Sequence, residues 1–224
     1  MFLQILSLIL ITSLFSCTIP AEKPRNIKEG SITFKISQTP VQKSSVLPNE
    51  MVIFFDEDNV RSKITGALNI YALEHIKNKK NDSTYTLLRV LDKRIYFSTP
   101  KSSGLFLFDA VKESDVVLID GIEKDILDFT CKKALLTMDQ KGLEPIEIFY
   151  TDKIRIDNPN ASTPFFKVPG VMLKFDIYLN RVKYTFEATE INQAKNEAEC
   201  FELNNNYQHI TEKEMKELIS SLME

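Results

Sequence analysis

Apolar and polar residues alternate with a period of two along much of this chain. The clearest runs cover residues 32–36, 68–73, 171–179 and 182–189. Successive side chains of a β-strand point to opposite faces, so each run offers one apolar and one more polar face. Short polar turns separate the runs and indicate antiparallel hairpins, because parallel strands require a longer crossover. The pattern predicts a single antiparallel β domain over residues 30–224.

Two further runs, Met51–Phe55 and Leu105–Phe108, are apolar at every position. Strands of this kind need cover on both faces, from a helix, a second sheet or a ligand.

The end of the chain carries the signals of one amphipathic helix. Thr211 and Glu214 have the spacing of a capping box. Four apolar residues then follow at i, i+3, i+4 and i+7, namely Met215, Leu218, Ile219 and Leu222. This stripe needs an apolar surface, and the two-sided strands supply one. We therefore predict a mainly β fold: a curved antiparallel sheet or half-open β-barrel with a C-terminal α-helix, residues 211–223, packed on its concave face.

The beginning of the chain differs from the rest, because its first 16 residues contain no charged side chain. The apolar segment Ile5–Leu14 is shorter than the roughly 20 residues that a spanning helix needs, and it has the length of a signal-peptide core. The sequence Leu14-Phe15-Ser16-Cys17 resembles the bacterial lipobox, in which a diacylglycerol is attached to the cysteine thiol before cleavage. We predict a signal peptide over residues 1–16, a lipidated Cys17 and a tether over residues 17–29, with attachment to a membrane through the lipid.

The charge balance excludes one class of partner. The chain has 28 basic and 31 acidic residues and a formal net charge of −3. Nucleic-acid-binding proteins carry a basic excess on the binding face, so nucleic acid is not an expected partner.

The sequence also lacks the motifs of common enzymes. It contains no nucleophile elbow, P-loop, dinucleotide fingerprint, HExxH motif or EF-hand loop. We predict no enzymatic activity, no catalytic residue, no metal site and no cofactor. His75, on one strand face with Tyr71 and Leu73, is interpreted as structural, and His209 as a residue preceding the helix. The acidic turn Asp56–Asn59 could bind a cation, but a hairpin tip explains it more simply.

Two cysteines, Cys131 and Cys200, remain after Cys17. Disulfides persist in exported proteins, so a bridge between them is one alternative. Two separate buried thiols are the other, and the sequence leaves both open.

Four segments in fixed order resemble the GLPGLI family of Bacteroidetes envelope proteins. They are Phe129–Ala134 with its Cys-Lys-Lys-Ala sequence, Ile148–Asp152, Val168–Leu173 around Pro169-Gly170, and Phe201–Tyr207. The resemblance implies the curved half-barrel of the lipoprotein-localisation carriers, no enzymatic activity, and a place in the bacterial envelope. From the residues themselves, Pro169 and Gly170 predict a type II turn or bulge with a positive φ at the glycine.

The function that these patterns favour is binding of an acyl chain or other apolar ligand inside the half-barrel. The candidate lining residues are Met51, Ile53, Phe55, Leu105, Leu107, Leu173 and Phe175, each of which could equally be core. The second hypothesis is a protein-interaction module or accessory subunit of an outer-membrane assembly, with an envelope protein as partner. The expected location is the outer membrane, lipid-anchored and facing the periplasm.

Overall fold

The computed structural model describes residues 26–40, 47–100, 114–138, 144–161, 163–179 and 182–223. The predicted signal peptide, Cys17, the tether up to residue 25, and the candidates Leu105 and Leu107 lie outside these residues.

The described residues form one sheet of twelve strands. In chain order these are β1 (Gly30–Thr39), β2 (Pro48–Phe55), β3 (Val60–Gly66), β4 (Tyr71–Lys77), β5 (Ser83–Val90), β6 (Lys93–Pro100), β7 (Ser114–Ile126), β8 (Phe129–Met138), β9 (Ile146–Thr151), β10 (Val171–Leu179), β11 (Val182–Asn192) and β12 (Gln208–His209). The described residues also form two short 3-10 helices, η1 (Ala67–Asn69) and η3 (Ala198–Phe201), and the helix α1 (Glu212–Met223).

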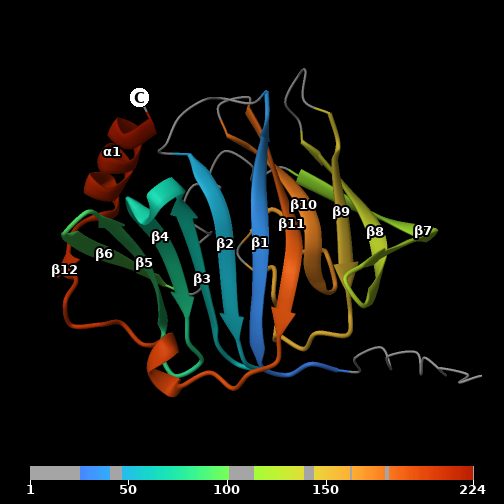
Figure 1. Cartoon of the computed structure of the whole chain (residues 1–224), viewed down its shortest axis with the longest axis horizontal. Coiled ribbons are helices and arrows are strands. Elements are labelled where there is room, and N and C mark those ends of the chain that lie inside the picture. Colours follow the sequence, from blue (N-terminus) through green and yellow to red (C-terminus); the bar gives the residue numbers. More distant parts are fainter. Residues whose placement is uncertain are drawn as a thin grey trace, which may run out of the picture.

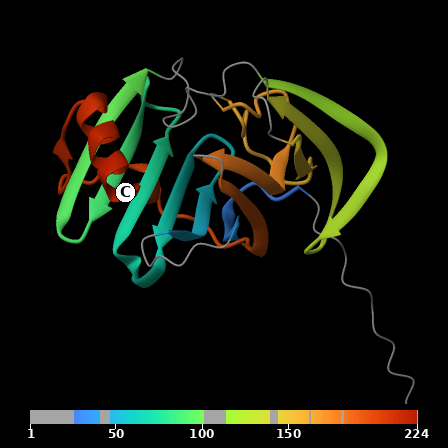
Figure 2. The same cartoon turned by 90° about the horizontal axis from the view of Figure 1, so that it is seen from above.

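The sheet consists of two antiparallel meanders joined side by side. Its order is β12-β6-β5-β4-β3-β2-β1-β11-β10-β9-β8-β7, so β1–β6 and β7–β11 each follow the chain, and the β1–β11 pair connects them (Figure 1). All pairs are antiparallel except β12 with β6. Seen from above, the sheet is strongly curved and open (Figure 2). The predicted fold class, a curved antiparallel sheet with one C-terminal helix, is confirmed.

The boundaries differ from the sequence prediction at two places. The run expected to begin at residue 68 becomes a strand only at Tyr71, because Leu68 and Asn69 adopt left-handed φ angles of 59° and 53°. The chain also joins the domain before Gly30. Ile27 forms a bridge with Ile154, and its backbone N–H donates to the Lys153 carbonyl at 2.9 Å.

A large apolar cluster lies on the face of the sheet that carries Phe34, which we call the inner face. It combines β1, β2 and β8–β11 with the connection between β9 and β10, residues 152–170. That connection contributes Phe165 and Val168, both buried. The centre of the cluster is aromatic. The Phe175 ring stacks on that of Phe186 with 4.9 Å between ring centroids, and it meets the Phe165 ring edge-on with 5.7 Å between centroids. A segment of the chain itself therefore closes this half of the sheet.

A second, smaller apolar cluster closes the other half. Met215 and Ile219 of α1 pack on buried residues of β5 and β6, which are Leu88, Ile95 and Phe97. The helix begins with the predicted capping box: the Glu214 N–H donates to the Thr211 hydroxyl at 3.3 Å, and the Thr211 N–H donates to the Glu214 carboxylate at 2.7 Å. The cluster residues that the structure describes lie between Ile27 and Ile219, and we expect residues 18–224 to fold alone.

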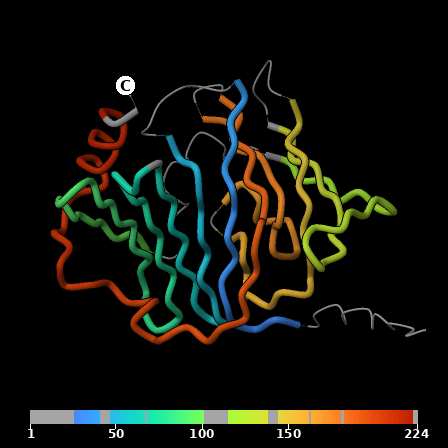
Figure 3. The backbone as a smooth tube through the Cα atoms, viewed as in Figure 1, coloured from blue at the N-terminus to red at the C-terminus, as the bar shows by residue number. Residues whose placement is uncertain are grey.

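Residues 193–210, which we call the C-terminal strap, connect β11 to α1. Figure 3 shows the strap running along one end of the sheet and up the edge at β6. Phe201 of the strap is buried. Asn78 donates to the Phe201 carbonyl at 3.2 Å, and Asn196 donates to the carbonyls of Gly30 and Phe55 at 2.8 and 3.0 Å. These bonds fix the strap against the sheet.

Candidate functional site

A continuous row of apolar side chains crosses six strands on the inner face. The strand register places each residue directly opposite the next, which puts all of them on one face. This apolar row consists of Phe34, Met51, Ile64, Leu73, Leu88 and Ile95. It connects the two clusters, since its β1–β2 end belongs to the large one and its β5–β6 end to the small one.

The cover over the apolar row differs along its length. Phe34 and Met51 are buried in the large cluster, and Leu88 and Ile95 are buried under α1. The two middle residues, Ile64 and Leu73, are only half-buried. The row therefore has closed ends and a partly accessible centre.

A polar row lies beside the apolar centre. Ser62, His75 and Thr86 are directly opposite one another on β3, β4 and β5 and share the inner face. The Nδ1 atom of His75 is 3.4 Å from the Thr86 hydroxyl. Burial, aided by the charge of Lys77, lowers the pKa of His75 to about 4, so the imidazole is neutral at pH 7. The centre of the inner face thus presents neutral polar groups next to apolar ones.

The structure places the described lining candidates in the large cluster. Met51, Phe55, Leu173 and Phe175 are buried, and Ile53 is partly buried against the cluster. Their apolar side chains contact the rest of the core, including the connection between β9 and β10. Met51 alone among them is part of the apolar row, so ligand lining by these residues stays a prediction.

The sequence analysis expected the helix to cover the two-sided apolar runs Met51–Phe55 and Leu105–Phe108. The second run lies outside the described residues, and α1 does not pack on the first. It packs on Leu88, Ile95 and Phe97, with Leu73 and Val90 at the edge of the contact. The tertiary path of the strap explains the difference. It carries the chain to β6, and α1 begins there, because the Ile210 N–H donates to the Tyr96 carbonyl at 2.8 Å.

Gly170 has a structural role of a different kind from the predicted one. Its φ is not positive, so no left-handed turn requires the glycine. A Cβ at this position would lie 2.4 Å from the Thr151 carbonyl oxygen. Glycine is required here because the chain at the start of β10 passes so close to β9 that a side chain has no room. The positive φ predicted from the sequence for Gly170 is therefore wrong. The Gly170 carbonyl accepts a bond from buried Asn160 at 2.8 Å, next to exposed Pro169.

The two cysteines are separate free thiols in the structure. Cys131 lies on β8 in the large cluster, whereas Cys200 lies in η3 of the strap, near β3. Burial raises the pKa of the Cys131 thiol to about 12, which keeps it protonated. The fold does not bring these two residues together.

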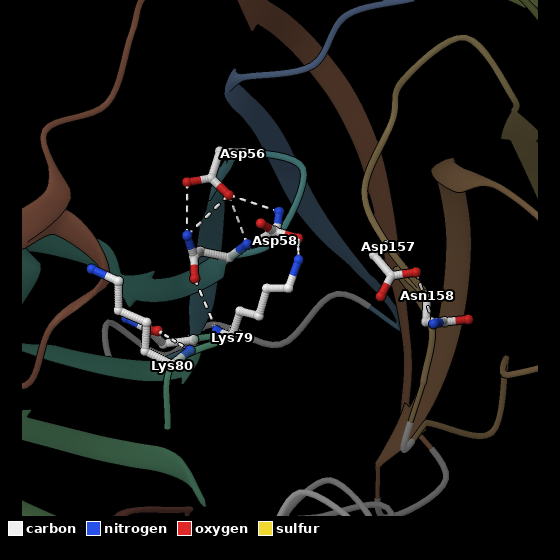
Figure 4. Close-up of polar contacts among 8 residues, drawn as sticks. Asp56, Asp58, Lys79, Lys80, Asp157 and Asn158 are labelled. Atoms are coloured by element: carbon white, nitrogen blue, oxygen red, sulfur yellow. Dashed lines mark hydrogen bonds and ion pairs between the residues drawn. The ribbon is translucent and has the colours of Figure 1, made fainter. Parts of the chain in front are cut away.

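The acidic turn Asp56–Asn59 forms the hairpin tip between β2 and β3 (Figure 4). The Asp56 carboxylate accepts the backbone N–H groups of Asp58 and Asn59 at 2.8 and 2.7 Å and also the Asn59 amide. Asp58 pairs with Lys79 at 2.6 Å. These two carboxylates therefore bind groups of their own turn and of the neighbouring turn at Lys79. Within the described ranges, no group of three His, Cys, Asp or Glu side chains could hold a metal ion.

An open cavity of about 480 Å³ lies on the other, outer face, between the strands and the C-terminal strap. Three arginines from β3, β5 and β6 line it, together with the strap residues Glu199, Glu202 and Leu203–Tyr207. The arginines are Arg61, Arg89 and Arg94. The sequence analysis missed this site. No local sequence pattern indicates that residues 199–207 lie over strands that precede them by more than a hundred positions in the chain.

His209 lies on β12 at the edge of the sheet, where its ring meets Tyr96 edge-on at 5.2 Å. Among the described elements, no helix has the length and apolar character needed to cross a membrane.

No protein-family model matches this chain. No curated protein matches it either. The resemblance to the GLPGLI family therefore stays a prediction.

Several solved structures align with this chain at low sequence identity. An uncharacterized conserved protein from Thermus thermophilus aligns with a TM-score of 0.44 and 8% identity over 81% of this chain and 90% of its own. Lipoprotein LppX of Mycobacterium tuberculosis aligns with a TM-score of 0.35 and 9% identity over 75% and 89%. LprF from Mycobacterium bovis aligns with a TM-score of 0.29 and 14% identity over 73% and 86%.

Proposed function

We propose that this chain is a non-enzymatic, lipid-anchored protein of the bacterial envelope that binds an apolar ligand, such as an acyl chain, on the inner face of its sheet. The observation that carries the proposal is the apolar row with its half-buried centre at Ile64 and Leu73. Apolar side chains that stay partly accessible on an inner face gain free energy when a ligand removes them from water, at roughly 25 cal/mol per Å².

The polar row supports a ligand with one polar end. Ser62, His75 and Thr86 lie next to the apolar centre and offer hydroxyl and imidazole groups, with Ser62 and His75 partly buried and Thr86 buried. Ligand sites are mostly apolar, with a few polar groups that fix the orientation of the ligand. A carboxyl or ester group beside the polar row, with its chain along the apolar row, fits this arrangement.

The helix α1 supplies the means of closing the site. Met215, Ile219 and the partly buried Leu218 of α1 pack on the β4–β6 end of the sheet, in a cluster smaller than the one in the other half. An element held by one small apolar contact opens at a lower free energy than the core strands do. In the proposal, α1 is the lid under which the ligand enters.

Native mass spectrometry of residues 18–224, followed by organic extraction, tests ligand binding directly. We expect a co-purified lipid, and displacement of a fluorescent fatty acid by the extract. The variants Ile64→Gln and Leu73→Gln are expected to weaken probe binding about tenfold each, because each exposes an amide to the apolar chain.

Val52→Gln is the matched control, since Val52 is also half-buried but lies on the opposite face of β2. Equal losses for Val52→Gln and Leu73→Gln, or the absence of any lipid and any probe binding, would contradict the proposal.

The membrane anchor is tested separately through Cys17. Cys17→Ala removes the thiol that lipidation requires, so we expect the protein to move from the membrane fraction to the soluble fraction. Fractionation of cells that express both forms, with outer and inner membranes separated, also tests the proposed outer-membrane location. Retention of the variant in the membrane fraction after a high-salt wash, which removes electrostatically bound protein, would refute lipid anchoring.

A second candidate function, a protein-interaction module, is favoured by the opposite edge of the sheet. β7 is the terminal strand there and exposes Val117, Leu118 and Ile122. Exposed Phe166 lies beside it, because Lys167 pairs with Asp115 of β7 at 2.8 Å. An apolar edge strand is a template for a partner. Capture of one envelope protein by the wild type and its loss with Leu118→Lys would support this function.

A further inference from the structure

Two arginines face each other across a pair of strands on the outer face. Arg89 of β5 and Arg94 of β6 are directly opposite in the register. Like charges at such positions destabilise a sheet. Within the part of the chain that the structure describes, no carboxylate forms an ion pair with either of them. Arg89 donates to the Asn69 carbonyl at 3.2 Å, and Arg94 is exposed.

The cavity beneath the strap gives this pair a place to bind an anion. Arg61, the third arginine, has its charge matched by buried Glu74 and donates to the Cys200 carbonyl at 2.8 Å. Arg61 thus holds the strap in position, while Arg89 and Arg94 keep donors available. Guanidinium groups bind phosphate oxygens through two parallel hydrogen bonds. The strap glutamates Glu199 and Glu202 also line the cavity.

Two exposed leucines lie at the neighbouring turns. Leu68, in η1 between β3 and β4, is 87% exposed, and Leu91, between β5 and β6, is 68% exposed. Both have left-handed backbones, with φ of 59° and 50°, which is unfavourable for leucine. The Leu91 N–H donates to the Ile70 carbonyl at 3.0 Å, so the two turns are joined to each other. Asn69 joins the first of them to Arg89.

Together, these features describe a surface suited to lipid. Exposed apolar side chains beside basic ones are the combination by which proteins lie on anionic membranes. We propose that this end of the outer face binds the phosphate of an anionic phospholipid at a membrane surface, with Arg89 and Arg94 holding the phosphate and Leu68 and Leu91 entering the acyl layer. The site lies on the face opposite the apolar row, so the inference goes beyond the proposed ligand binding and does not depend on it.

Flotation with vesicles tests the inference with residues 18–224, which lack the predicted lipid anchor. We expect binding to vesicles of phosphatidylcholine mixed with phosphatidylglycerol and much weaker binding to phosphatidylcholine alone. Arg89→Gln and Arg94→Gln should each weaken binding to the anionic vesicles about fivefold. Leu68→Asn and Leu91→Asn should each weaken it about tenfold. Asparagine tolerates the left-handed conformation, so these variants keep the fold.

Matched controls come from the other half of the sheet. Leu127 is an exposed leucine with φ of 52° at the turn between β7 and β8, and Arg155 is an exposed arginine after β9. Leu127→Asn and Arg155→Gln should leave vesicle binding unchanged.

Three outcomes would overturn the inference. The first is equal binding to anionic and neutral vesicles, and the second is an equal loss in the Leu127→Asn control. The third is calorimetric binding of inorganic phosphate that depends on Arg89 and Arg94 while the Leu68 and Leu91 variants bind vesicles like the wild type. That result would assign the cavity to a soluble phosphate compound.

Discussion

The two halves of the sheet are closed in different ways. In the half built from β1 and β8–β11, the connection between β9 and β10 packs on the inner face, and Phe165 completes the aromatic stack of Phe175 and Phe186. The buried amide of Asn160 in this connection has hydrogen-bond partners, because it donates to the Val168 and Gly170 carbonyls at 2.8 Å each. In the half built from β3–β6, the cover comes from the distant C-terminus, as α1 on one face and the strap on the other.

The difference indicates how the molecule divides stability and function. The first half is a closed core, because the connection between its own strands β9 and β10 covers it. The second half retains the polar row, the half-buried Ile64 and Leu73, and the arginine cavity. Binding regions are drawn from the less stable parts of a protein, because they must open or accept a partner. The comparison predicts that mutations in the first half unfold the protein, whereas mutations in the second change local opening.

The largest effect is expected for Phe175→Ala in the large cluster. Phe175 stacks on Phe186 and meets Phe34 and Phe165 edge-on. Removal of its ring should lower the free energy of unfolding by about 4 kcal/mol, from lost burial and a residual cavity. Urea denaturation of residues 18–224 measures this change. A loss below about 1 kcal/mol would show that the stack is not part of the stable core.

The next effect is expected for Met215→Ala, which removes the fully buried side chain of α1. Loss of a buried methionine costs about 3 kcal/mol. The comparison predicts that this appears as local opening: amides of α1 and β12 exchange hydrogen faster, while those of β1 and β11 keep the wild-type rate. Uniformly faster exchange across the whole sheet would mean that the two halves unfold as one unit.

A smaller, pH-dependent effect is expected from His75. Its pKa is about 4 in the folded state and about 6.5 in an unfolded chain, so the unfolded state binds more protons between these values. Stability should therefore fall as the pH is lowered from about 6.5 to about 4, by about 2 kcal/mol once water screening of the half-buried ring is allowed for. His75→Gln should flatten this decrease and leave the pH dependence above about 6.5 as it is. A variant profile parallel to that of the wild type would contradict the assignment.

The smallest effect is expected for the helix cap. Thr211→Ala removes the hydroxyl that accepts the Glu214 N–H. Caps of this type contribute about 1 kcal/mol. Hydrogen exchange should be faster in the first turn of α1 only, and Thr211→Ser should restore the wild-type rate. Faster exchange that extends into β6 would show that the cap supports the whole helix contact.

Local patterns in the sequence predict much of this fold. Strand alternation at Val171–Leu179, the turn at Asp56–Asn59 and the capping box at Thr211 all depend on residues a few positions apart. Such features follow from the geometry of strands, turns and helix ends. Apolar faces could also be assigned, because period two decides which side chains share a face.

The positions of α1 and the C-terminal strap on the sheet could not be predicted in this way. The sequence shows that α1 needs an apolar partner, and several strands offer one. The path of the strap places α1 on Leu88 and Ile95, whereas the sequence analysis expected it on the two-sided apolar runs. In the same way, the arginine pair exists because β5 and β6 meet in one register, and its cavity exists because residues 199–207 lie over them.

The sequence alone determined the curved antiparallel β class, the capped C-terminal helix and the faces of the strands, because short-range geometry and the burial of apolar groups fix them. Tertiary structure decided which half of the sheet each segment covers, the apolar row that links the clusters, and the two sites proposed for ligand and lipid. These depend on contacts between residues far apart in the chain, and no local pattern specifies which of several compatible surfaces will meet.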